Sequence, residues 1–194
     1  MVTMMSTGDE VPKGFEGYFT DKERDAKGAL TIDCVALKQL SQSEIDEMDA
    51  LRTRALDNYT ATTGNELERI SIHDELALAP EGSDPAEKLI FRAYKGGDLV
   101  AYAHVLCGWP RANEWTVEQL LLDPTYRLKG IGTKVIGAVE SLARTAEART
   151  TSILSLPSRE GAQSFWNHLG YEDKTEELKD ELSGSHLKIM RKVL

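Results

Sequence analysis

The chain has 194 residues, of which 41% are apolar, and its 32 acidic residues against 23 basic ones give a net charge of -9. This length suits one domain with or without an extension, and the acidic balance disfavours a nucleic-acid binder, which normally carries a basic face. No apolar stretch approaches the ~20 residues that span a bilayer, so we expect no membrane partner.

Residues 1–29 are polar and rich in glycine and charge, which predicts an extension with little structure of its own before a single domain over residues 30–194. Aromatic residues in this extension could dock on the domain or on a second subunit, which leaves a homodimer open. The first ten residues lack the basic and apolar parts of a secretory signal. We therefore expect a cytoplasmic protein in which Cys34 and Cys107 are reduced thiols.

Alternating and β-branched residues predict a first strand over residues 30–37. Ser41 and Glu44 have the spacing of a capping box, and apolar residues then recur at helical spacing as far as Tyr59. A second helical pattern covers residues 65–78 and stops before Pro80.

The second half of the chain has more strands than helices. Two apolar runs, 88–94 and 99–106, flank a Gly-Gly turn and predict a hairpin, and a further strand covers 114–122. A long helix over 130–148, a strand over 151–156 and a helix ended by Gly170 follow. A short strand from Tyr171, an acidic connector over 176–181 and a final strand over 186–194 complete an α/β fold with a mixed sheet.

The turn before the long helix is the most informative stretch, and it reads Arg127-Leu128-Lys129-Gly130-Ile131-Gly132. A strand, a glycine turn and a helix start form an anion site, because the first helical N–H groups have no partner and the two glycines let a phosphate approach closely. The Gly-Lys-Ser/Thr of a Walker loop and the third glycine of a dinucleotide fingerprint are both missing. Nucleotide hydrolysis and nicotinamide binding are therefore disfavoured.

The flanks of this turn make the pattern specific. Residues 118–127, the helix 162–171 with its Ala-x-x-Phe-Trp sequence, and the closing strand 188–192 resemble corresponding segments of the GNAT acyltransferase superfamily, in the same order. The resemblance implies a mostly antiparallel sheet of six to seven strands with about four helices. It also implies acetyl-CoA or another acyl-CoA as co-substrate.

In this family the strand before the turn splays from its parallel neighbour, and the pantetheine arm lies in the gap. By position, the resemblance assigns cofactor binding to Leu120, Leu121, Leu122, Arg127, Leu128, Lys129, Gly130, Ile131, Gly132 and Thr133, with Arg159 and Trp166 from the later helix. Solvated loop charges are the alternative for Arg127 and Lys129, as simple exposure is for Arg159. The four histidines lack ligand spacing, so we expect no metal.

The chemistry needs a neutral amine, so a carboxylate or an ordered water must accept a proton. Period-two alternation puts Glu118 on the strand face of Leu120 and Leu122, which makes it the first candidate base; Glu114 is second. Either carboxylate could instead be only exposed or salt-bridged. Leu122 N–H is the candidate to polarise the thioester carbonyl.

The leaving thiolate often receives its proton from a tyrosine of the later helix in this family. Trp166 occupies that position, and an indole cannot act as an acid. Tyr171, Ser164 or a water could donate instead, or the thiolate could leave unassisted.

These features predict an N-acetyltransferase acting on a primary amine of a small molecule or peptide. Acidic residues of the first two helices suggest a cationic acceptor, although a solvated helix face explains them equally well. An acyl-CoA-binding module with little or no turnover is the alternative, and Trp166 is the feature that favours it.

Overall fold

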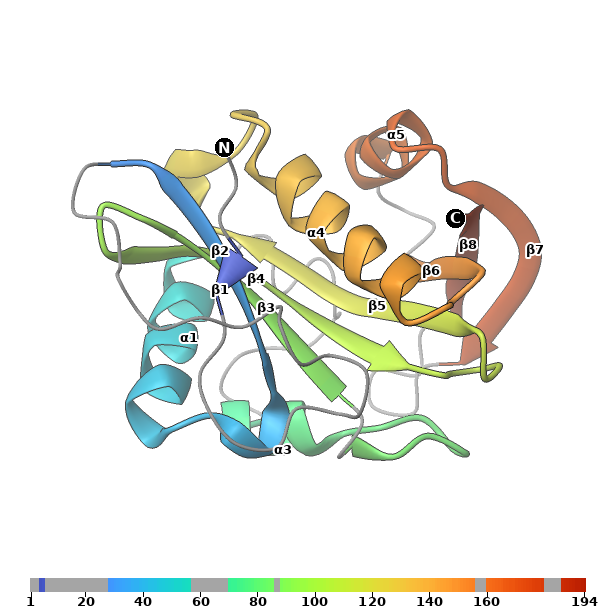
Figure 1. The fold of residues 1–194 in the computed structure, drawn as a ribbon, viewed down its shortest axis with the longest axis horizontal. Coiled ribbons are helices and arrows are strands. Elements are labelled where there is room, and N and C mark those ends of the chain that lie inside the picture. The colour runs from blue at the N-terminus through green and yellow to red at the C-terminus, as the bar shows by residue number, and fades with distance from the viewer. Residues whose placement is uncertain (1–3, 6–27, 57–69, 86–87, 156–159, 180–185) are drawn as a thin grey trace.

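The computed structural model describes residues 4–5, 28–56, 70–85, 88–155, 160–179 and 186–194. Within these residues eight strands form one sheet in the order β1-β2-β3-β4-β5-β6-β8-β7 (Figure 1). The strands are β1 (Met4–Met5), β2 (Leu30–Ala36), β3 (Lys88–Lys95), β4 (Asp98–Cys107), β5 (Glu114–Leu122), β6 (Thr150–Ser155), β7 (Glu172–Lys179) and β8 (His186–Val193). The helices are α1 (Gln42–Arg54), α3 (Ile72–Ala77), α4 (Ile131–Thr145) and α5 (Glu160–His168).

The sheet is mixed and mostly antiparallel, as predicted. Among the described strands, only β1 with β2 and β5 with β6 pair in parallel. Residues 30–194 contribute seven strands and four α-helices to the described part of the chain, and β1 adds an eighth strand from the N-terminal extension.

Each face of the sheet has its own apolar cluster. One cluster joins α4 and Trp166 of α5 to inward side chains of β2–β6, and we call this side the α4 face. The other joins α1 and α3 to the alternate side chains of β2–β5, and we call it the α1 face. Alternation along each strand therefore decides which helix layer a side chain meets.

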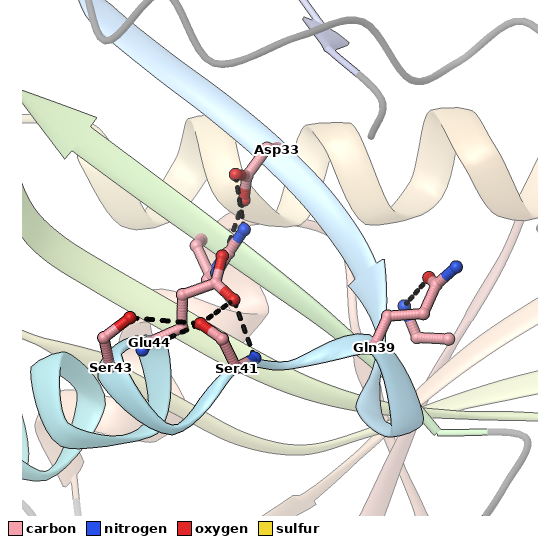
Figure 2. A network of polar contacts seen from close by, with 7 residues as sticks. Asp33, Gln39, Ser41, Ser43 and Glu44 are labelled. Carbon is pink, nitrogen blue, oxygen red and sulfur yellow. Dashed lines mark hydrogen bonds and ion pairs between the residues drawn. The ribbon is translucent and has the colours of Figure 1, made fainter. Parts of the chain in front are cut away.

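A buried ion-pair network fixes α1 to the sheet. Arg92 of β3 is 1% exposed, and its Nε and Nη2 donate to the two carboxylate oxygens of Asp33 at 2.8 and 2.7 Å. Its Nη1 donates to Oε1 of Glu44 at 2.7 Å. The other oxygen of Glu44 accepts from the backbone N–H of Ser41 at 2.8 Å, which completes the predicted capping box (Figure 2).

Two predicted boundaries differ in the structure. Part of the predicted helix 65–78 lies outside the described residues, as does Tyr59, and the described helix begins only at Ile72, after the N-cap Ser71. The prediction of an acidic connector over 176–181 is wrong as far as Lys179, because β7 continues to that residue and pairs with β8. Acidic side chains are compatible with this strand because it lies at the edge of the sheet.

In the part of the chain that the structure describes, no helix is both long enough and apolar enough to cross a membrane.

Candidate active site

The sheet opens between its two central parallel strands. β5 and β6 pair only from Glu114 opposite Thr150 to Val117 opposite Ile153. Beyond that point β5 continues beside β4, whereas the last residues of β6 pair with β8. The two strands therefore part from Glu118 onward, and we call the space between them the opening.

A β-bulge in β5 lies where the strands part. Val105 of β4 is opposite Val117, but the next residue, His104, is opposite Gln119. Glu118 is therefore the extra residue of β5, and the alternation of side chains shifts by one position there.

The bulge overturns the prediction that Glu118 shares a face with Leu120 and Leu122. The two leucines pack against the cluster of the α4 face, while the carboxylate of Glu118 contacts Lys88 on the α1 face. Leu121 is buried in the cluster of the α1 face. Period-two counting failed because it assumed an uninterrupted strand.

Backbone groups of β5 face the opening. The N–H of Asp123 donates to Val100 O of β4 at 2.9 Å. In an antiparallel pair the backbone N–H and C=O groups of successive residues point alternately toward the partner strand and away from it. The groups of Leu121, two residues before Asp123, therefore also point toward β4. The backbone N–H and C=O groups of Leu120 and Leu122 then point away from β4, toward the opening.

The glycine turn lies at the carboxyl end of the same strand. Gly130, the N-cap of α4, has φ +75°, and no side chain caps the helix. A Cβ there would meet nothing within 4 Å, so the backbone is open to an approaching group. Leu128 is also left-handed, with φ +58°, and is fully exposed. An uncapped helix start beside an exposed turn fits a pyrophosphate.

The other residues of the turn differ in their contacts and in their burial. Nζ of Lys129 donates to Thr125 O at 2.7 Å and lies over the ring of Tyr126. Arg127 is half-buried, Thr133 is exposed and Ile131 is buried in the core. A Cβ on Gly132 would meet Cζ of Phe165 at 3.2 Å, so the close packing of α4 on α5 also favours a glycine at this position.

Glu118 is a partly accessible carboxylate in a buried setting. Its side chain is 17% exposed, and Oε2 lies 2.8 Å from Nζ of Lys88, which also donates to Leu78 O at 2.6 Å. Burial raises the pKa of Glu118 above its ordinary value, and the Lys88 ammonium opposes that rise. A carboxylate whose pKa is raised toward neutrality is suited to accept a proton.

The second candidate base, Glu114, is engaged elsewhere. It is buried between Arg191, whose Nε lies 2.7 Å from Oε1, and Arg111, whose Nη1 lies 3.0 Å from Oε2. It also begins the closed part of the β5–β6 pair, opposite Thr150. Glu114 is therefore salt-bridged, which was the alternative to its predicted role as a base.

The aromatic candidates lie in the core of the α4 face. Trp166 contacts Phe165 and Tyr171 edge-to-face, with ring centroids 4.8 and 5.3 Å apart. The Tyr171 hydroxyl donates to Oγ1 of Thr151 at 3.0 Å, and burial raises its pKa. Thr151 is opposite Trp115 in the closed part of the strand pair, so Tyr171 lies away from the opening.

Two predicted residues remain. Arg159 lies outside the described residues, and Ser164 is exposed on α5. Lys88 was not among the predicted site residues, although a lysine at the start of an apolar-rich strand pattern was a visible signal. Among the described residues, no group of three or more His, Cys, Asp or Glu side chains could hold a metal ion.

Comparison with known proteins identifies the family of the chain. The family model described as "Acetyltransferase (GNAT) family" matches residues 48–171, and the chain belongs to this family. No curated protein matches the chain.

Solved acetyltransferases share the fold at low sequence identity. An acetyltransferase from Thermus thermophilus has a TM-score of 0.62 at 19% identity, covering 86% of this chain and 99% of its own. The ribosomal-protein-S18-alanine N-acetyltransferase from Escherichia coli has 0.59 at 15%, covering 84% and 93%. The PaiA N-acetyltransferase from Thermoplasma acidophilum, solved with coenzyme A, has 0.58 at 16%, covering 84% and 99%.

Proposed function

We propose that the protein transfers an acetyl group from acetyl-CoA to a primary amine of a small molecule or peptide. The observation that carries the proposal is the position of Glu118, a partly accessible carboxylate at the point where β5 and β6 separate. The glycine turn lies at the other end of the same opening. The candidate base and the candidate anion-binding turn thus lie on β5 and directly after it.

The cofactor would lie along β5. The amides of residues 128–133 would hold the pyrophosphate at the start of α4, with Arg127 and Lys129 adding positive charge. The backbone of Leu120 and Leu122 would pair with the pantetheine arm as a neighbouring strand does. Trp166 would support this site through Phe165, since its own ring is buried in the core.

Leu120 is a better oxyanion donor than Leu122. The thioester must lie near the base, and a strand advances about 3.3 Å per residue, so Leu120 is ~7 Å along the strand from Glu118 and Leu122 is ~13 Å away. Leu120 N–H therefore suits the thioester carbonyl, and Leu122 suits the middle of the pantetheine arm.

The reaction is direct attack. The amine nitrogen bonds to the carbonyl carbon, the C–S bond breaks, and the sulfur leaves with its electron pair. Glu118 accepts the proton lost by the nitrogen. Because Tyr171 donates into the core, a water molecule in the opening is the better proton donor to the thiolate.

The acidic residues of the first helices give little support to a cationic acceptor. Asp49 and Glu75 both pair with Arg52, at 2.6 and 2.7 Å, so one of their two negative charges is compensated within the protein. We therefore propose a primary amine as the acceptor without assigning it a further positive charge.

The alternative function is acyl-CoA binding without turnover. The burial of both Trp166 and Tyr171 favours it, because neither can serve as the thiolate's acid. A thiol-release assay with acetyl-CoA and a panel of amines, run beside calorimetric titration with CoA, distinguishes the two. Binding with no release for any amine would refute the transferase.

A further inference from the structure

Lys88 is a buried cation that the proposed reaction does not yet use. Its side chain is 1% exposed, and it lies at the start of β3 on the α1 face. Its ammonium group contacts two oxygens: Oε2 of Glu118 at 2.8 Å and the carbonyl of Leu78, the C-cap of α3, at 2.6 Å. A charge buried this deeply is costly unless it is paired, so these two contacts fix its position.

The other charged groups around this pair come from three further elements. Arg52 of α1 is held by Asp49 and by Glu75 of α3. His104 of β4 is buried, and burial together with Lys88 and Arg52 lowers its pKa well below the ordinary value, so it is neutral. Among the described residues, Lys88 is therefore the cation in direct contact with Glu118.

Exposure separates the roles of the two partners. Glu118 is 17% exposed and can meet an acceptor, whereas Lys88 is enclosed and cannot touch one. We propose that Lys88 is a positioning residue for the base: its ammonium group fixes one oxygen of Glu118 and leaves the other to receive the proton of the amine. This inference rests on the proposed function and extends it to a second residue.

The ion pair also decides the charge of the base. Burial favours the protonated form of Glu118, and Lys88 is the main influence that lowers its pKa in return. Without the ammonium, burial would raise the pKa of Glu118 further and so favour the protonated form, which cannot accept a proton. Removing Lys88 should therefore move the acid limb of kcat/KM to higher pH.

The test compares Lys88→Met, Lys88→Gln and Lys88→Arg with the unchanged chain. The pH dependence of kcat/KM is measured with the best amine from the panel. We expect the acid limb to rise by about one pH unit or more in the two neutral variants, which is about a tenfold loss on the acid side. Lys88→Arg should keep the limb near its original position, because it keeps the charge. Lys88→Gln gives a second neutral variant if Lys88→Met does not fold.

Lys192→Met is the matched control, since Lys192 pairs with buried Glu140 at 2.8 Å in a second lysine–glutamate contact. Loss of that pair should lower the melting temperature without moving the acid limb. A limb that stays in place in both neutral Lys88 variants, or that moves equally in Lys192→Met, would overturn the positioning role.

A second measurement does not depend on turnover. Carbon-13 NMR of glutamate-labelled protein, with Glu118→Gln to assign the signal, reports the titration of Glu118 directly. We expect the titration midpoint of Glu118 to rise in the neutral Lys88 variants even if no amine is acetylated. In that case the proposed function fails, but the coupling, by which we mean the effect of Lys88 on the protonation of Glu118, is supported. An unchanged midpoint would refute the coupling even in an active enzyme.

Discussion

Gly132 and Gly137 of α4 can each be replaced by alanine, and their surroundings differ. A Cβ on Gly137 would meet nothing within 4 Å, whereas a Cβ on Gly132 would meet Cζ of Phe165 at 3.2 Å and Cδ2 of Leu120 at 3.6 Å. Alanine favours a helix interior by about 1 kcal/mol over glycine. Gly137→Ala should therefore stabilise the protein by about that amount, or by about 2–4 °C for a chain of this size.

Gly132→Ala should act in the opposite direction. Ordinary carbon contacts lie near 3.5–4.0 Å, so Phe165 would have to move by a few tenths of an ångström, and overpacking of this kind costs about 1–3 kcal/mol. After the helix gain, a net loss of about 0–2 kcal/mol remains.

Urea denaturation of both variants gives the difference in unfolding free energy, and calorimetry with CoA gives the effect on the cofactor. We expect Gly132→Ala to be about 1–3 kcal/mol less stable than Gly137→Ala. The reasoning is refuted if the two variants are equally stabilised, because the contact with Phe165 would then make no difference to the free energy of unfolding.

Three further changes test other parts of the molecule. Leu128→Gly should stabilise the protein by about 0.5–1 kcal/mol in thermal denaturation, because a left-handed leucine is strained and this one is fully exposed; destabilisation would contradict this. Glu118→Gln should lower kcat about 10²–10⁴-fold while leaving CoA affinity nearly unchanged, and an unchanged kcat would exclude Glu118 as the base. Arg92→Met should cost about 3–5 kcal/mol in urea denaturation, since it removes the buried guanidinium that holds the carboxylates of Asp33 and Glu44, and a loss below about 1 kcal/mol would argue against the network.

Local sequence signals predicted most of the fold. The capping box at Ser41 and Glu44, the Gly-Gly hairpin and the C′ glycine at Gly170 depend on residues close in sequence, and the structure has each of them. The glycine turn belongs to the same group, because a strand, a turn and a helix start follow one another directly.

The roles of the site carboxylates depend on partners distant in sequence. Glu114 meets Arg191, and Glu118 meets Lys88, through the order of strands in the sheet. The bulge at Glu118 depends on its register with β4, which the pattern of β5 alone does not contain. Both carboxylates are salt-bridged, and strand alternation could not distinguish Glu114, which is enclosed, from Glu118, which is partly accessible.

The bulge explains how one strand could serve both substrates. It places Leu120 and Leu122 on the α4 face, where the uncapped helix start would hold the pyrophosphate, and directs Glu118 to the α1 face. In the proposed reaction the cofactor and the amine then reach the opening from opposite sides of the sheet. An uninterrupted β5 that keeps Leu120 and Leu122 on the α4 face would put residue 118 on that face as well, which is the side proposed for the cofactor.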